Sequence, residues 1–229
     1  MSHVKSKRRY ASTGRQAQAR RTREEILDVA ERQFLDIGYA ATTIAAVAAD
    51  AGVSVETIYK AFGGKSGLVR AIYDRGLTGR ESVPAYERSD DMRLQETDPA
   101  IIMRQWGLLT AEVASVVTPI RLLIRSAAAT DPKMSALLED SDAERLTRMR
   151  HHAQFLAERG HLRDGVTIAE ATDILWTCSS VEIYELLVLK RGWSPRRFAQ
   201  FIADFMISSL LPDSEQNAPD PDEPPPPKL

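Results

Sequence analysis

Apolar residues recur at helical spacing along almost the whole chain, and this periodicity is the strongest constraint on its fold. Alternating runs of Val, Ile and Thr, which would indicate strands, are absent. The sequence therefore predicts an all-α fold. Its 229 residues are enough for one small and one larger domain, since compact domains usually have roughly 100–150 residues.

The clearest local pattern is a pair of short helices joined by a tight turn. Thr43 is a capping residue in front of a helix expected over 44–50, and Ser54 is one in front of a helix expected over 55–62. Gly52 can supply the turn between them. Two short helices joined by a Gly-containing turn are a helix-turn-helix, a structure that places its second helix in the major groove of DNA.

Longer helices are expected on both sides of this pair. A helix over 21–37 carries one apolar stripe and stops at Gly38, a residue suited to a left-handed helix end. Another begins near Lys65, with Leu68 and Ile72 on its inner face. The sequence thus predicts an N-terminal helix-turn-helix domain in front of a larger helical domain.

The segment over residues 23–68 resembles the TetR family of one-component bacterial regulators. The markers of this resemblance are Gly38-Tyr39, Thr42-Thr43, Ala51-Gly52-Val53-Ser54, Thr57-x-Tyr59-x-x-Phe62 and Lys65. It implies a homodimer that binds a palindromic operator and that a small-molecule effector releases, most simply a repressor.

The resemblance also implies which side chains meet DNA. It assigns phosphate contacts to Thr43, Thr57 and Tyr59, and a phosphate clamp to Lys65. Exposed positions at the start of the second short helix must read bases. Glu56 at this place must either accept a hydrogen bond from a cytosine amino group or point along the helix dipole, away from the DNA backbone. The expected DNA-contacting residues are Thr43, Ser54, Val55, Thr57, Tyr59, Lys60 and Lys65. Capping alone is the alternative role for the hydroxyls of Thr43 and Ser54.

Charge is distributed unevenly between the two ends of the chain. Residues 1–80 hold 14 Lys and Arg against 8 Asp and Glu, which leaves 16 against 24 for the remainder. A basic arm beside a groove-reading motif gains affinity from each phosphate that it meets. The expected division is a flexible basic arm over 1–19, a DNA-binding domain over 20–80, a ligand-binding and dimerisation domain over 81–211, and a disordered Pro-rich acidic tail over 212–229.

Helix boundaries in the larger domain are expected as follows. Residues 76–97 should form a loop or the seam between the two domains, and a long helix should begin at Pro99 and be broken or kinked at Pro119. Two separate helices should cover 132–138 and 141–159, and a single helix should cover 167–190.

The last helix should begin at Ser194-Pro195 and carries an apolar stripe of unusual bulk. The stripe consists of Phe198, Phe201, Ile202, Phe205 and Met206. Helix pairs with such wide apolar faces are commonly covered by a second copy of the chain, so the sequence predicts a homodimer joined through residues 167–211. A purely internal core is the alternative.

Candidate effector contacts come from aromatic, thioether and hydroxyl side chains in the central helices. They are Met103, Trp106, Thr110, Trp176, Glu182 and Tyr184. Such a set suits a mostly apolar molecule, although ordinary core packing explains it equally well. Glu182 is the exception, because an acid in so apolar a helix must pair, face water or meet a cationic ligand.

Other functional classes find less support in the sequence. The histidines at 151, 152 and 161 lack the spacing of a metal site and are expected at the surface. The lone Cys178 has apolar neighbours and suits a core thiol better than a nucleophile. No Gly-rich phosphate loop is present, so we expect neither an enzyme nor a cofactor. A ligand-independent architectural DNA-binding protein remains the other alternative.

The location of the protein follows from its composition. No stretch approaches the roughly 18 uninterrupted apolar residues that span a bilayer, and the first 25 residues lack the apolar run of a secretory signal. We therefore expect a soluble cytoplasmic protein without a membrane partner.

Overall fold

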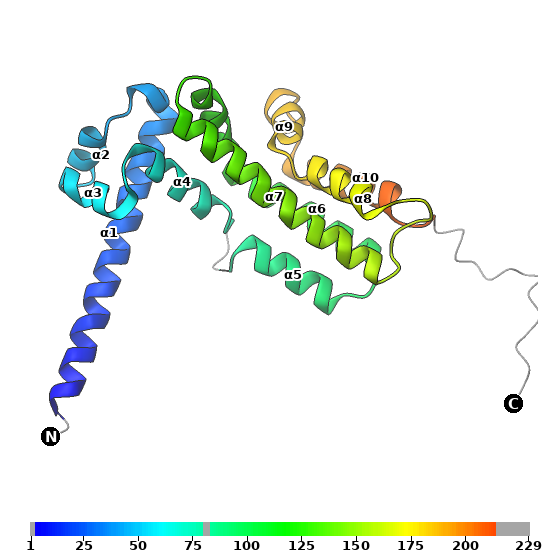
Figure 1. The fold of residues 1–229 in the computed structure, drawn as a ribbon, viewed down its shortest axis with the longest axis horizontal. Helices are drawn as coiled ribbons and strands as arrows, with labels where there is room; N and C mark the ends of the chain where they lie inside the picture. Colours follow the sequence, from blue (N-terminus) through cyan, green and yellow to red (C-terminus); the bar gives the residue numbers. More distant parts are fainter. Residues whose placement is uncertain (1–2, 80–82, 214–229) are drawn as a thin grey trace, which may run out of the picture. The chain divides into compact units, whose positions relative to one another are not determined.

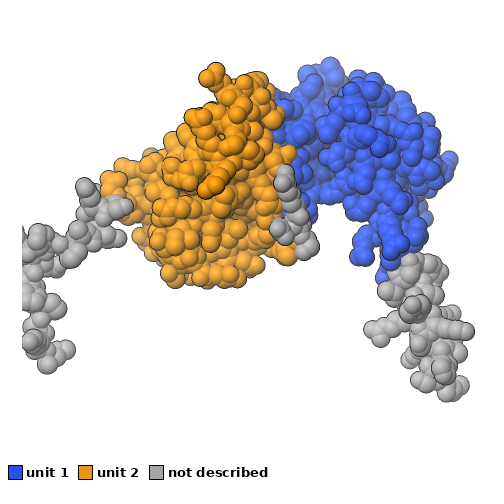
Figure 2. Space-filling view, turned by 180° about the vertical axis from the view of Figure 1, so that it is seen from behind, with its two compact units in different colours: residues 1–79, 116–141 blue, residues 80–115, 142–229 orange. Residues whose placement is uncertain are grey.

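A computed structural model describes residues 3–79 and 83–213 of the chain. Within these ranges every regular element is a helix, which confirms the all-α prediction (Figure 1). The chain divides into two compact units, coloured separately in Figure 2. Unit 1 comprises residues 1–79 and 116–141, and unit 2 comprises 80–115 and 142–229. Residues 116–141, which the sequence analysis assigned to the larger domain, thus belong to unit 1.

Unit 1 contains the four N-terminal helices. They are α1 (His3–Ala41), α2 (Ile44–Asp50), α3 (Val55–Phe62) and α4 (Lys65–Gly76). Its core is made of large side chains excluded from water: Ile26, Leu27, Phe34, Val47, Ile58, Leu68, Val69 and Ile72. Each helix contributes at least one of them, so burial of these apolar faces holds the four helices together.

Helix α1 begins earlier than the sequence predicted. It starts at His3, so residues 3–19 are helical where an irregular arm was expected. Gly38 ends the regular helix as predicted, with φ of 84°. Residues with positive φ are usually glycine, since an L side chain strains there. The predicted acidic tail lies outside the described residues from 214 onward.

Unit 2 holds most of the remaining helices. They are α5 (Ala85–Gln95), the first part of α6 (Pro99–Ala128), most of α7 (Pro132–Glu158), α8 (Ile168–Cys178), α9 (Val181–Tyr184), the π-helical turn η1 (Glu185–Lys190) and α10 (Pro195–Leu210). Close approach of α6 and α10 requires Gly107, because a Cβ there would lie 2.6 Å from the Ala199 carbonyl oxygen. The core cluster of unit 2 includes Ile102 and Met103 of α6 and Phe198 and Ile202 of α10.

Two helices are continuous where breaks were expected. Helix α6 continues through Pro119, although proline removes a backbone donor there. The neighbouring Thr118 and Ile120 are buried, so packing stabilises this turn. Helix α7 is continuous where two helices were expected: Ser141 donates to the Leu138 carbonyl at 2.9 Å and accepts from Arg121 instead of capping a new helix.

Two other boundaries were also wrong. The segment over 76–97, expected to be a loop or a domain seam, contains both helix α5 and the division between the two units after residue 79. The polar side chains of α5 bind those of α6 and α7. The helix expected over 167–190 is interrupted at Ser179 and Ser180. Arg145 of α7 donates to the Trp176 carbonyl and to the Ser179 hydroxyl, which satisfies acceptors at the end of α8.

Helix α6 is long and apolar enough to cross a membrane, but half of its most apolar window is buried within the protein. The core helix of a water-soluble protein has the same properties, so this one helix is weak evidence for a membrane span.

Candidate nucleic-acid interface

The predicted caps and turn of the helix-turn-helix are present in unit 1. The Thr43 hydroxyl accepts from the Ala46 N–H at 3.1 Å, and the Ser54 hydroxyl accepts from the Thr57 N–H at 3.2 Å. Each satisfies a backbone donor that the first helical turn leaves free. Gly52 makes the turn with φ of 65°. These local hydrogen bonds set where α2 and α3 begin.

Burial of one face of each short helix exposes the other face. Val47 and Ala48 of α2 and Ile58 of α3 are buried, whereas Thr57, Tyr59 and Lys60 are exposed. Thr43 and Ser54 are exposed as well, and Val55 is half-buried. The structure therefore gathers six of the seven predicted DNA-contacting residues at the helix-turn-helix, and five of these six are exposed.

Glu56 is fully exposed on the first turn of α3. Hydrogen bonds from its own backbone N–H and from Ser54 hold the pKa of Glu56 below its ordinary value of 4.5. An ionised carboxylate at this end also interacts favourably with the helix dipole. The ionised form of Glu56 is thus stabilised by the start of α3 itself and does not require a DNA base as its partner.

Lys65, the predicted phosphate clamp, is half-buried and already has protein partners. Its ammonium donates to the Ala40 carbonyl at 3.3 Å and lies 4.2 Å from the centroid of the Tyr39 ring. Burial lowers the pKa of Lys65, and the charge of Asp131 opposes that change. Lys65 therefore joins the start of α4 to the end of α1 in the free protein.

Tyr39 connects this lysine to the start of α7. Its hydroxyl donates to a carboxylate oxygen of Asp131 at 2.7 Å. Burial and this bond raise the pKa of Tyr39, and the same bond lowers the pKa of Asp131. Asp131 also accepts from the Lys133 N–H at 2.8 Å, so it caps α7 while holding Tyr39.

Two arginines that the sequence analysis did not single out stabilise the same unit. Arg23 of α1 lies 4.4 Å from the centroid of the Phe62 ring at the end of α3. Arg75 of α4 bonds Glu24, Asp28 and Glu31 on α1, with distances of 3.3, 2.7 and 2.5 Å. The spacing of the three acids places them on one face of α1, and this spacing was the signal in the sequence for the ion pairs of Arg75.

The predicted effector contacts are spread over unit 2. Met103, Trp106 and Tyr184 are buried in one core cluster. Trp176 and Thr110 are half-buried, and Glu182 is exposed. The Trp176 ring faces Arg145, whose guanidinium carbon lies 4.4 Å from its centroid. The structure thus brings three of the six candidates together.

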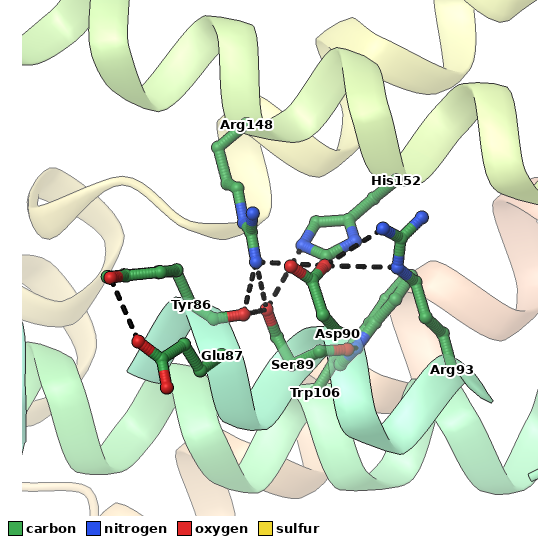
Figure 3. A network of polar contacts seen from close by, with 8 residues as sticks. All are labelled: Tyr86, Glu87, Ser89, Asp90, Arg93, Trp106, Arg148 and His152. Carbon is green, nitrogen blue, oxygen red and sulfur yellow. Dashed lines mark hydrogen bonds and ion pairs between the residues drawn. The ribbon is translucent and has the colours of Figure 1, made fainter. Parts of the chain in front are cut away.

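A polar network beside Trp106 was missed because its members come from distant segments (Figure 3). His152, expected at the surface, is only 4 % exposed and packs on the Trp106 ring, with centroids 4.2 Å apart. Arg148, one turn earlier on α7, pairs with Asp90 of α5 at 3.0 Å. Burial lowers the pKa of His152 to about 3, and the charges of Arg148 and Arg93 act in the same direction. No group of three metal-binding side chains occurs in the described part of the chain.

Comparisons with known proteins bear on both units. Residues 26–72 match the family described as bacterial regulatory proteins, tetR family. Over 88 residues the chain is 36 % identical to the HTH-type transcriptional regulator TtgR of Pseudomonas putida, covering 38 % of this chain and 40 % of that protein. The chain therefore spans less than half the length of this curated relative.

Solved structures are similar over more of the chain. The SmeT–triclosan complex has a TM-score of 0.67 at 22 % identity, covering 90 % of this chain and 99 % of that one. NalD, described as the secondary repressor of the MexAB-OprM multidrug efflux pump in Pseudomonas aeruginosa, has a TM-score of 0.65 at 19 % identity, covering 85 % and 99 %. At these identities the likeness establishes a shared fold.

Proposed function

We propose that this chain, whose residues 26–72 match the tetR family of bacterial regulatory proteins, is a ligand-responsive transcriptional regulator. It binds a palindromic operator as a homodimer, acts as a repressor in the cytoplasm, and leaves DNA when a small, mostly apolar molecule binds to its second domain. The observation that carries the proposal is the helix-turn-helix of unit 1, whose recognition helix α3 exposes Thr57, Tyr59 and Lys60.

The DNA contacts divide by chemistry. Hydroxyls at Thr43, Thr57 and Tyr59 suit phosphate oxygens, which fix the position of the protein on the duplex. Val55 and Lys60 suit base edges: Val55 can pack on a thymine methyl group, and Lys60 can donate a hydrogen bond to guanine. Lys65 reaches a phosphate after giving up its bond to the Ala40 carbonyl.

The homodimer is supported by apolar side chains that a single chain leaves in water. Near the C-terminus they lie on three elements, α8, η1 and α10, and they are Ile168, Leu186, Leu189, Phe201 and Phe205. On α10, Phe201 and Phe205 stack with centroids 6.5 Å apart. Large apolar side chains exposed on neighbouring helices are typical of a subunit interface.

A small apolar effector is supported by the aromatic core of unit 2 and by the structurally similar SmeT, which was solved as a complex with triclosan. We assign the effector to unit 2 around Met103, Trp106 and Tyr184, with Thr110, Trp176 and Glu182 as further candidates. This assignment requires no metal or cofactor.

Selection of bound duplexes from random DNA by the full chain tests the proposal. We expect enrichment of an inverted repeat whose half-sites are about 10 base pairs apart or a multiple of that distance. Lys65→Ala should weaken binding to every duplex, whereas Lys60→Ala should also change the preferred half-site. Enrichment of no sequence would contradict the proposal and favour an architectural DNA-binding protein.

A further inference from the structure

Helix α3 has little apolar packing with which to fix its direction in unit 1. It has eight residues, and Ile58 is the one side chain among them that is fully buried. At its N-terminal end the Ser54 hydroxyl bonds the first turn of the same helix, so this cap does not join α3 to another element. A helix held by one buried side chain can still turn about it, and its direction therefore depends on contacts at the C-terminal end.

Two other helices supply such contacts. Helix α4 comes so close that a Cβ at Gly67 would overlap the carbonyl oxygen of Phe62. From α1, the Arg23 guanidinium lies 4.4 Å from the centroid of the Phe62 ring and donates to the Ala61 carbonyl at 3.4 Å. The last carbonyls of a helix have no partner within it, and a cation beside them interacts favourably with the helix dipole. Arg23 thus binds both the backbone and the last side chain of α3.

We propose that Arg23 is a positioning residue for sequence recognition: it holds the end of α3 against α1 and so sets the angle at which Val55 and Lys60 meet the base edges. This role rests on the operator binding proposed above. Hydrogen bonds to bases weaken steeply when they are misaligned, whereas the attraction between a cation and a phosphate changes slowly with distance. Loss of the correct angle should therefore weaken binding to the operator more than binding to other sequences.

A direct phosphate contact is the competing role for Arg23, since its charged side chain is exposed. The two roles predict different results. A phosphate contact contributes equally to every sequence, and its loss reduces the salt slope by about 0.9. A positioning role instead requires the half-buried ring of Phe62, which has no charge to offer DNA. In the free protein the guanidinium already faces this ring, which favours positioning.

The test compares binding of the full chain to its selected operator and to a scrambled duplex of equal length, by fluorescence anisotropy at several salt concentrations. Arg23→Met keeps a long side chain and removes the charge. We expect it to lower the ratio of the two affinities about tenfold, the discrimination that about one base contact supplies, and to leave the salt slope on the scrambled duplex unchanged. Arg21→Met, which removes the same charge from an exposed position on α1, should leave the ratio unchanged.

A double-mutant cycle asks whether Arg23 acts through Phe62. Phe62→Leu removes the ring beneath the guanidinium, so it should lower the affinity ratio as Arg23→Met does. The double variant should then be no worse than the more affected single variant. Arg23→Lys, which keeps a cation able to lie over the ring, should recover part of the ratio. Partial unfolding of a variant reduces both affinities by the same fraction, so a merely structural defect leaves the ratio unchanged.

Three results would each overturn the positioning role. They are an unchanged ratio in Arg23→Met, equal weakening on both duplexes with a shallower salt slope, and independent effects of Arg23 and Phe62 in the cycle. All three leave the regulator standing, because an operator has then been selected. Selection that enriches no sequence would instead contradict the proposed function and the role of Arg23 together.

Discussion

Tyr39 shows how one side chain in unit 1 connects the start of α4 to the start of α7. Its ring supports the ammonium of Lys65, and its hydroxyl bonds the carboxylate of Asp131. The position of Lys65, the proposed phosphate contact, thus depends on the residue that caps α7. Lys65 was predicted from the family resemblance, but its dependence on Asp131, which is distant in sequence, required the structure.

Tyr39→Phe should destabilise the protein at neutral pH and matter less in acid. The Tyr39 hydroxyl lowers the pKa of Asp131 in the folded protein below its ordinary value of 3.8. This hydrogen bond therefore stabilises the fold fully above pH 3.8, and its contribution is lost as the pH falls through the pKa of Asp131 in the folded protein. Urea midpoints at pH 7 and near pH 3 measure the difference between variant and wild type. Tyr59→Phe, at an exposed hydroxyl, is the control and should change neither midpoint. A loss of stability in Tyr39→Phe that is larger near pH 3 than at pH 7 would contradict this account.

At the scale of whole helices, α10 divides its aromatic side chains between the core and the surface. Phe198 is buried, while Phe201 and Phe205 on the same helix are each more than 40 % exposed. Replacing both exposed residues by Glu should therefore give monomers that keep their helix content. Light scattering measures the mass, and Gln200→Glu on the same helix is a matched control for added charge. An unchanged dimer mass in the double variant would place the interface elsewhere.

Residues 1–19 contain five of the 14 Lys and Arg of residues 1–80 and no Asp or Glu. Deleting residues 1–19 should weaken binding to all duplexes alike and reduce the dependence of affinity on salt, with a slope change of about 0.9 for each phosphate that these residues neutralise in the wild type. Fluorescence anisotropy at several salt concentrations measures both. A changed operator preference with an unchanged salt slope would instead mean that this segment reads bases.

Elements set by local chemistry were predictable from the sequence. Thr43, Gly52 and Ser54 act on backbone groups within a few residues, so α2 and α3 were placed correctly. The wrongly predicted boundaries are those that depend on side chains distant in the sequence. Arg145 bonds the end of α8, and Ser141 finds Arg121 instead of capping a helix. The burial of His152 likewise depends on α5, a helix whose sequence has no clear apolar stripe.

At the scale of the whole molecule, two helices belong to both units. Helix α6 passes from unit 2 into unit 1 after residue 115, and α7 returns to unit 2 after residue 141. A ligand that displaces residues of α6 or α7 in unit 2 therefore acts on helices whose other ends belong to unit 1. The recognition helices of a dimer must lie about 34–36 Å apart to enter successive major grooves, so a small shift in each subunit spoils the fit.

The central claim is that ligand and operator bind to different states of the protein, and linkage makes it measurable. A coupling free energy of roughly 1–3 kcal/mol lowers operator affinity about 5–150-fold when ligand is bound, and operator must lower ligand affinity by the same factor. Calorimetric titration of the ligand into the free protein and into the protein saturated with operator tests this directly. We expect the ligand to bind the operator complex more weakly than it binds the free protein. The factor should equal the one by which the ligand weakens operator binding. Equal ligand affinities in the two titrations would contradict the account.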